Sequence, residues 1–392
     1  MHITKRIFTI GLSFLLLFLF SISTFADGTD EIVATTAPGT PTVSAKSMIL
    51  MEATTGQILM ENASNEKMPV SYLVKLMTLL LTMEAINANK FTFETMITTS
   101  ANANAIGDPK IWLNKGEQIS VDELLKSITV GNANDACVAL AEAVAGNEQE
   151  FVSLMNLKAS QLGMKNTAFL NSTGIECEGQ YSSAYDVALL AKELLKYEKL
   201  TPYLTTWMVD VRAGSTNLVN TNLLVRSFNG ITGMKAATST AAGNCLVATA
   251  KRNDLNLICV MLGCPSKDQR FVDAKSILNY AFSINDIFSP NIKSELLKPI
   301  SVKGGEINKV DISIEKTSSL VIPKGTSKNI QTKILLENTL NAPIMKGQVV
   351  GKVQFFDGDK LVLETNVITK KEVNKMSMKI ALQKLLENLL NF

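Results

Sequence analysis

A stripe of apolar side chains at helical spacing stands near the start of the chain and follows a segment with the alternation typical of strands. The stripe consists of Leu73, Leu76, Met77, Leu80 and Leu81, which share one side of a helix. The preceding segment, 47–60, alternates and turns at Thr54-Thr55-Gly56, which predicts a hairpin-like entry. The chain is therefore expected to begin its first domain with a hairpin that leads into a helix.

Helix start and stop signals recur further along the chain. Ser120-Val-Asp-Glu123 matches a capping box, and Asn147-Glu-Gln-Glu150 matches one with asparagine as the cap, so each predicts the start of an amphipathic helix. Gly146 and Gly163 stand where the C-terminal caps of helices belong. These signals predict at least two further helices between residues 120 and 163.

Strand patterns follow the helical region. Two β-like runs, 244–250 and 255–262, flank a charged turn, and a predicted helix over 271–282 closes the domain. Since helices and strands are mixed throughout residues 44–285, this region is expected to be an α+β domain.

Between residues 286 and 300 the pattern changes to short alternating strands. Val310, Ile312 and Ile314 form one alternating set, and a hairpin turns at Asp357-Gly358. The arms of this hairpin carry Val353 and Phe355 on one side and Leu361 and Leu363 on the other. Residues 292–370 are therefore predicted to form a small all-β domain.

The last stretch, 373–392, predicts an amphipathic helix. Its apolar face would carry Met378, Leu382, Leu385, Leu386 and Leu389, and its lysines lie elsewhere on the helix. The stretch is too short and too charged to span a bilayer, but such a helix can lie in the membrane surface. The alternative is an ordinary helix packed on its own domain. The terminal position favours the membrane-associated interpretation.

The N-terminus has the composition of a secretory signal peptide. Lys5 and Arg6 precede an apolar run from Ile7 to Phe20, and a small residue, Ala26, ends the segment at the expected cleavage position. An uncleaved membrane anchor is the alternative, although small polar residues interrupt the end of the segment. Residues 1–26 are thus predicted to be removed on export, and 27–43, rich in Thr, Ala, Gly and Pro, to form a flexible leader.

Composition and charge narrow the possible functions. The 392 residues are 46% hydrophobic and 19% charged, which is a globular composition. Without Lys5 and Arg6, the 38 basic residues fall to the same number as the 36 acidic ones, and a neutral chain without basic blocks gives no support for nucleic-acid binding. The five cysteines are too scattered for a disulfide framework; most are expected to be buried, although one pair could close.

The only histidine, His2, lies in the predicted signal peptide. A mature chain without histidine excludes Ser-His-Asp and Cys-His catalysis and leaves no histidine ligands for zinc, so neither a metal site nor a cofactor is expected. Any hydrolytic chemistry must depend on lysine.

Several stretches resemble the low-molecular-mass penicillin-binding proteins, the serine D-alanyl-D-alanine carboxypeptidases. The three motif regions are 67–78 (KMPVSYLVKLMT), 131–142 (GNANDACVALAE) and 233–239 (GMKAATS), the last running into 242–250. Similar stretches also occur at 164–169, 181–186, 214–222 and 342–351, so the resemblance covers about residues 44–392. It implies a transpeptidase domain like that of penicillin-binding proteins and β-lactamases, an antiparallel sheet flanked by helices, followed by the β-domain.

The resemblance also implies a catalytic set that this chain has altered. In the Ser-x-x-Lys motif the serine attacks the peptide carbonyl and the lysine takes its proton. Lys75 is present, but Tyr72 occupies the nucleophile position. The Ser-x-Asn motif has become Asn132-Ala-Asn134, and Lys-Thr-Gly has become Lys235-Ala-Ala. A phenol is a poor substitute for an acylating serine, and Asn132 cannot relay a proton as a hydroxyl can.

The same resemblance indicates two positions that could still bind substrate and one alternative nucleophile. Lys235 and Ser239 match substrate-binding positions, and Lys75, a buried cation without its serine, has Asn134 as its candidate partner. Ser71 is the alternative nucleophile, since Ser71 and Lys75 share a helix face at i, i+4. However, moving back one residue rotates the side chain by about 100°. A helix N-cap is therefore the favoured interpretation of Ser71.

The expected function is that of an exported carboxypeptidase homologue of peptidoglycan metabolism that is catalytically inactive and acts by binding wall peptide or partner proteins. The alternative is an active enzyme that trims the terminal D-Ala of stem pentapeptides with Ser71. Expected ligands are a D-Ala-D-Ala stem peptide or a β-lactam, bound weakly, and the membrane surface. The expected location is the outer face of the cytoplasmic membrane or the cell wall.

Overall fold

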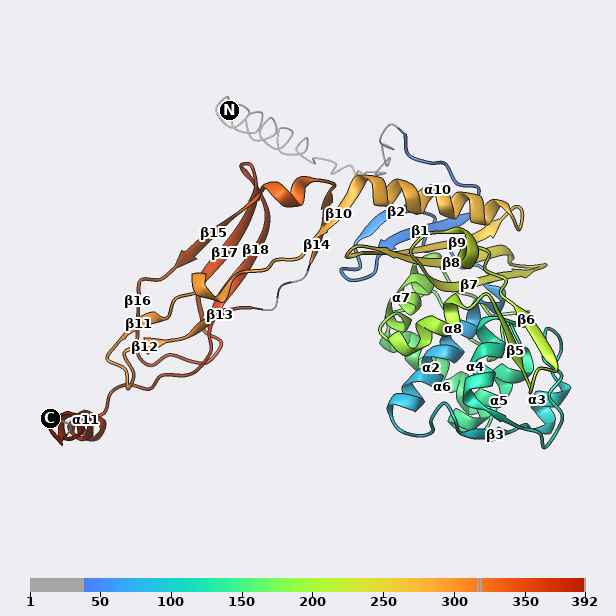
Figure 1. The fold of residues 1–392 in the computed structure, drawn as a ribbon, viewed down its shortest axis with the longest axis horizontal. Helices are drawn as coiled ribbons and strands as arrows, with labels where there is room; N and C mark the ends of the chain where they lie inside the picture. The colour runs from blue at the N-terminus through green and yellow to red at the C-terminus, as the bar shows by residue number, and fades with distance from the viewer. Residues whose placement is uncertain (1–38, 316, 318, 391–392) are drawn as a thin grey trace, which may run out of the picture. The chain divides into compact units, whose positions relative to one another are not determined.

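The computed structural model describes residues 39–315, 317 and 319–390. The predicted signal peptide and most of the predicted leader lie outside these residues. The first domain is built on a five-stranded antiparallel sheet in the order β2-β1-β9-β8-β7 (Figure 1). Its strands are β1 (Ser47–Glu52), β2 (Ile58–Asn62), β7 (Ile231–Ser239), β8 (Gly243–Arg252) and β9 (Leu255–Cys264). The predicted entry hairpin is confirmed as the β1–β2 pair.

Helices cover both faces of this sheet, which confirms the predicted α+β class. Helix α10 (Gln269–Ile284) lies on one face, where the short α9 (Leu224–Ser227) shares its core cluster through Leu224. The remaining helices of this domain gather on the opposite face (Figure 1). They are the short η1 (Ser71–Val74) and η2 (Glu198–Leu200), α2 (Lys75–Asn87), α3 (Ala101–Ala105), α4 (Val121–Thr129), α5 (Asn134–Ala145), α6 (Glu148–Gln161), α7 (Ala184–Leu194) and α8 (Thr201–Thr205). Two small hairpins accompany them: β3 (Met96–Thr98) with β4 (Gln118–Ser120), and β5 (Met208–Val211) with β6 (Thr216–Val219).

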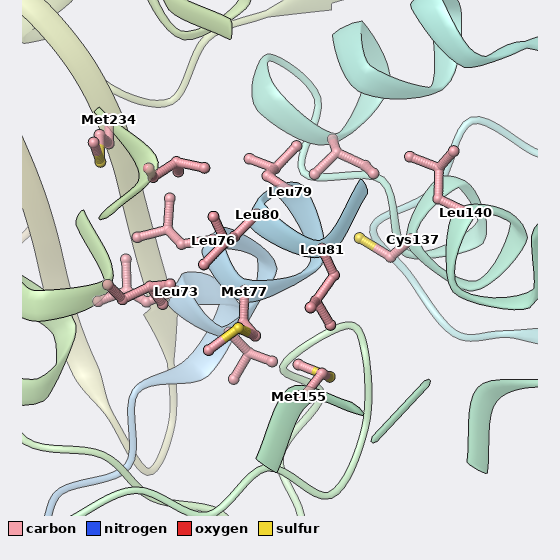
Figure 2. Close-up of a cluster of buried hydrophobic side chains, with 14 of the residues drawn as sticks. Leu73, Leu76, Met77, Leu79, Leu80, Leu81, Cys137, Leu140, Met155 and Met234 are labelled. Carbon is pink, nitrogen blue, oxygen red and sulfur yellow. The ribbon is translucent and has the colours of Figure 1, made fainter. Parts of the chain in front are cut away.

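Helix α2 is buried on all sides rather than along one stripe. Besides the predicted stripe, Leu79 and Met83 are almost fully buried. Figure 2 shows why: side chains from α5 (Cys137, Leu140), α6 (Met155) and β7 (Met234) surround those of α2. A helix enclosed in this way has little freedom to move, because each buried leucine contributes about 1.5–3 kcal/mol and the interior is close-packed. It is a rigid base for the residues at its N-terminal end.

The predicted caps fix the neighbouring helices. Ser120 Oγ accepts a hydrogen bond from the Glu123 amide at 3.2 Å, and Asn147 Oδ1 accepts one from the Glu150 amide at 2.9 Å. Gly146 ends α5 with φ of +88°, a conformation that glycine adopts without steric cost. Both capping predictions are therefore confirmed, and they bound α4, α5 and α6.

The β-domain contains a four-stranded sheet in the order β13-β18-β17-β15 and smaller pairings. The predicted hairpin is confirmed, since Asp357 pairs with Lys360 and Phe355 pairs with Leu363 across β17 and β18. The strands are β10 (Asn285–Phe288), β11 (Ile300–Lys303), β12 (Lys309–Val310), β13 (Ile312–Ile314), β14 (Leu320–Pro323), β15 (Ile330–Leu336), β16 (Thr339–Asn341), β17 (Val349–Asp357) and β18 (Lys360–Thr369), with short η3 (Ser294–Leu296) and η4 (Thr326–Asn329).

The C-terminal helix begins later than predicted. Helix α11 spans Met378–Leu390, whereas Val373 belongs to the core of the β-domain: it is 2% exposed and exchanges two backbone hydrogen bonds with Ile344. Residue 373 is therefore part of the sheet region rather than of the helix. Of the helices within the described ranges, none combines the length and apolar character that crossing a bilayer requires.

Candidate active-site cleft

The junction of η1 and α2 places Tyr72 directly over Lys75. These residues are three apart, so they lie one turn from each other, and Lys75 Nζ is 4.2 Å from the centroid of the Tyr72 ring. An ammonium over an aromatic face is stabilised by about 0.5–2 kcal/mol. The ring therefore fills the space in front of the lysine.

Lys75 is fully buried and hydrogen-bonded. Its Nζ donates to Asn134 Oδ1 at 2.7 Å and to the Thr173 carbonyl at 2.5 Å. Asn134 in turn donates from Nδ2 to the Gly107 carbonyl at 2.8 Å. Burial disfavours the ammonium form and lowers the pKa of Lys75 to about 8. The structure thus brings the first-motif lysine and the second-motif asparagine into direct contact.

Lys235 is a second buried lysine in the same cleft. It is 2% exposed, and its Nζ donates to the Ile128 carbonyl at 2.7 Å. Burial, and then repulsion from the Lys75 charge, lower the pKa of Lys235 to about 7. Cys137 lies close enough to both lysines to interact with them, but burial raises the pKa of its thiol to about 11. This cysteine is a buried thiol rather than a reactive one.

Asn132 occupies the position of the second-motif serine in a left-handed backbone conformation, with φ of +58°. Its Nδ2 donates to Thr221 Oγ1 at 3.2 Å, and its buried Oδ1 has no hydrogen-bond partner among the described residues. The amide is therefore held by Thr221 rather than by either lysine.

A cavity of about 360 Å³, which we call the Tyr72 pocket, joins these residues to the edge of the sheet. Its wall includes Tyr72, Asn132 and Thr221 on one side and Ala236, Ala237 and Thr238 of β7 on the other. Because β7 is the outer strand of its sheet, the free edge of this strand faces an open cavity. Such an edge can bind an extended peptide through backbone hydrogen bonds.

The pocket also contains a residue that sequence reasoning missed, Arg270 of α10. Its Nη1 donates to the carbonyls of Ala237 at 2.7 Å and Cys245 at 3.1 Å, and to Thr238 Oγ1 at 3.1 Å. The guanidinium is 5% exposed, so its main role here is to hold the end of β7. A single arginine on an amphipathic helix carries no sequence signal that would have identified it.

Asp135, within the second motif region, is another residue whose role was missed. Its buried carboxylate accepts hydrogen bonds from the backbone amides of Ile111 at 3.1 Å, Leu113 at 3.0 Å and Ala136 at 2.9 Å. This carboxylate ties residues 107–113 to the start of α5, and the same segment supplies the Gly107 carbonyl that binds Asn134. Asp135 therefore holds the segment whose Gly107 carbonyl positions Asn134.

The interpretation of Ser71 as a helix N-cap is wrong. The residue that precedes η1 is Val70, and Ser71 Oγ is buried without a hydrogen-bond partner among the described residues. The reason is the backbone: Ser71 itself has φ of +48°, and η1 starts as a tight 3-10 turn, so its hydroxyl does not face the free amides.

Ser71 lines a cavity other than the Tyr72 pocket. This cavity, of about 410 Å³, also includes Gly174, Glu176 and Ala241. A Cβ atom at Gly174 would lie 2.2 Å from the Ser71 carbonyl oxygen, so only glycine permits this close approach. Ser71 thus lines a cavity that includes neither Lys75 nor Asn132 among its described residues.

Ser239 is not among the residues that line the Tyr72 pocket in the described part of the chain; Thr238 lines it instead. The Ser239 hydroxyl accepts a hydrogen bond from the Ala242 amide at 3.3 Å and bonds to Glu176. That bond to Ser239, followed by the bond from the Ala241 amide, lowers the pKa of the Glu176 carboxyl. Ser239 therefore stabilises a carboxylate on the protein itself.

The phenol of Tyr72 and the acidic side chains near it complete the description of the cleft. Burial, then the charges of Glu176 and Asp108, raise the pKa of Tyr72, so its phenol stays protonated at neutral pH. Within the described residues, His, Cys, Asp and Glu side chains form no group of three that could hold a metal ion.

Comparisons with known proteins agree with this architecture. Residues 34–266 match the model of the D-alanyl-D-alanine carboxypeptidase family, and residues 288–375 match the C-terminal domain of penicillin-binding protein 5. The D-alanyl-D-alanine carboxypeptidase DacF of Bacillus subtilis is 36% identical over 335 residues, covering 84% of this chain and 86% of the relative.

Solved structures show the same similarity. Penicillin-binding protein 5 from Haemophilus influenzae has a TM-score of 0.76 at 29% identity, covering 86% of this chain and 99% of its own. Penicillin-binding protein D2 from Listeria monocytogenes, in its ampicillin-bound form, has a TM-score of 0.57 at 26% identity, covering 62% of this chain and 100% of its own. The predicted fold and family resemblance are confirmed: this protein belongs to the D-alanyl-D-alanine carboxypeptidase family of peptidoglycan metabolism.

Proposed function

We propose that this protein is an exported, catalytically inactive member of its family that binds wall peptides or partner proteins through the cleft. The observation that carries the proposal is the Tyr72 ring, which lies 4.2 Å from Lys75 Nζ where an attacking hydroxyl would have to stand. The expected signal peptide over residues 1–26 supports export.

Energetic considerations favour loss of activity over a change of substrate. Removing the nucleophile of a serine hydrolase costs on the order of a millionfold in rate, or about 8 kcal/mol of barrier. Here Asn132 and Ala236 also replace hydroxyl residues of the other two motifs. Peptide binding requires less, because a free strand edge and a cavity beside Ala236, Ala237 and Thr238 are sufficient for it.

The alternative enzyme would use Ser71, and the geometry supports it poorly. The Ser71 hydroxyl is buried, has no described hydrogen-bond partner and lines a cavity other than the one that contains Tyr72 and Asn132. A general base must be within hydrogen-bond reach of the proton that it takes, directly or through one water. Lys75 instead donates to Asn134 and Thr173.

A fluorescent penicillin tests the proposal. The purified, folded protein is expected to form no covalent adduct and to release no D-alanine from a D-Ala-D-Ala peptide. A thermal unfolding curve on the same sample verifies that it is folded. An adduct that disappears in a Ser71→Ala variant would establish the shifted nucleophile and overturn the proposal.

We further propose that α11 attaches the protein to the membrane surface. Met378, Leu382, Leu385 and Leu386 are 90%, 59%, 58% and 50% exposed, which is unusual for large apolar residues on one helix. Such a row can enter the acyl boundary of a bilayer. Lys384 donates from Nζ to the Glu306 carbonyl, so one lysine of the helix is held by the β-domain.

Charged residues on the apolar face are expected to abolish membrane attachment. Leu382→Glu with Leu386→Glu should shift the protein from the vesicle pellet to the supernatant in a sedimentation assay with anionic lipid, because two charges cannot enter the acyl region. These variants leave Val373 in the β-domain core. Ser377→Glu, which lies before the helix, is the control and should still sediment; equal sedimentation of all three proteins would contradict the proposal.

A further inference from the structure

The cleft does not end at the sheet edge. A second cavity of about 450 Å³, which we call the Trp207 pocket, adjoins the Tyr72 pocket, and the two share Leu223, Asp268 and Phe271 in their walls. These three shared residues place the two cavities side by side, and we call the pair the groove. The groove therefore extends from Tyr72 past β7 and along α10 to Trp207.

The far part of the groove has an aromatic and cationic lining. The Arg226 guanidinium lies 5.0 Å from the Trp207 ring centroid, Lys275 lines the same pocket, and Leu223 is 43% exposed beside them. A stacked guanidinium has fewer orientations to lose on binding than a free side chain and presents several donors in a plane. This combination is suited to a carboxylate next to an apolar group.

Charge separates the groove from the cavity around Ser71. The groove wall carries the exposed or half-buried cations Lys267, Arg226 and Lys275 against one acid, Asp268. The cavity around Ser71 is lined by Glu176 and Glu178, and none of its described lining residues is Lys or Arg. Anionic ligands are therefore favoured beyond β7 and disfavoured on the side of Ser71.

Among its described lining residues, the near part of the groove offers a single accessible cation, Lys267. Arg270 Nη1 is engaged by two backbone carbonyls and by Thr238, and Ala236 offers a methyl group. Lys235 donates to Ile128 and is buried. Arg226 and Lys275 line only the Trp207 pocket, so a ligand that meets them must extend beyond the Tyr72 pocket.

We propose that the groove binds cross-linked wall peptide, in which the chain continues past the D-alanine position and carries further carboxylates to Arg226 and Lys275. This inference rests on the proposed binding of wall peptide at the β7 edge and names the class of that peptide. A peptide that ends at the D-alanine would leave the Trp207 pocket empty.

Binding measured by isothermal titration tests the inference with the full-length protein. The probes are a cross-linked peptide dimer released from peptidoglycan, the uncross-linked pentapeptide, and poly-L-glutamate. The dimer is expected to bind roughly tenfold more tightly than the pentapeptide, a gain typical of a few exposed charge pairs. Arg226→Gln with Lys275→Gln should remove this preference, and Asp268→Asn should increase it.

The control variant is Lys199→Gln with Lys251→Gln, which removes the same charge from exposed positions outside both pockets and should leave the preference unchanged. Equal affinity for dimer and pentapeptide overturns only this inference, whereas binding of neither contradicts wall-peptide binding itself. Poly-L-glutamate that binds as tightly as the dimer, with the same dependence on Arg226, overturns the assignment to wall peptide.

Discussion

Restoring the four altered motif residues is expected to restore covalent labelling by a fluorescent penicillin. The variant combines Tyr72→Ser, Asn132→Ser, Ala236→Thr and Ala237→Gly. Lys75 already contacts Asn134 at 2.7 Å on a rigid, buried helix, so a serine at position 72 would face a base that is in place. The labelling rate should rise at least about a thousandfold above the parent, since a nucleophile with its base supplies several orders of magnitude.

Three controls identify the origin of the restored labelling. Tyr72→Phe alone should not label, because it removes the phenol without adding a nucleophile. Lys75→Met in the restored background should abolish labelling, and Ser71→Ala in that background should leave it intact. Labelling that depends on Ser71 would contradict the assignment of residue 72 to the nucleophile position.

The free energy of unfolding should rise between pH 7 and pH 9 because of the two buried lysines. Burial lowers the pKa values of Lys75 and Lys235 to about 8 and 7 from an ordinary 10.5. Above pH 7 the unfolded chain therefore holds more protons than the folded one, and stability increases with pH. The expected rise, summed over both lysines, is roughly 4 kcal/mol, measured by urea unfolding at each pH.

The rise in the free energy of unfolding is limited to a range of pH. Below about pH 7 both states hold the Lys235 proton, so its contribution to the slope disappears. Above pH 9 unfolded thiols lose their protons before buried Cys137, whose pKa is raised, and this opposes the rise. A Lys235→Met variant should have a flatter profile between pH 7 and pH 9; an unchanged slope would contradict the pH assignment.

The sequence predicts the elements of this fold where a local pattern fixes them. Ser120 and Asn147 cap helices as expected, and the turn at Asp357-Gly358 closes the expected hairpin, because each signal depends on a few adjacent residues. The predicted start of the C-terminal helix at residue 373 was wrong. Val373 lies in the β-domain core because it pairs with Ile344, which is distant in the sequence.

In the candidate site, too, local patterns predict some features, whereas features that depend on distant segments were not predicted. Motif spacing indicates that Tyr72 stands one turn from Lys75, but the backbone turn at Ser71 was not predictable, because it results from packing against Gly174. Arg270 belongs to no motif region, and the role of Asp135 within its motif region was not predicted, because both roles depend on backbone groups of distant segments. Hydrogen bonds between buried charged side chains and distant backbone groups produce no recognisable pattern in the sequence.

The position of Val373 also sets a tether length. Only residues 374–377 separate this last core residue from α11, and four residues span at most about 14 Å when fully extended. A helix lying on a bilayer would therefore keep the β-domain almost against the lipid headgroups. Such a short connection would restrict any ligand of the β-domain to material next to the membrane surface.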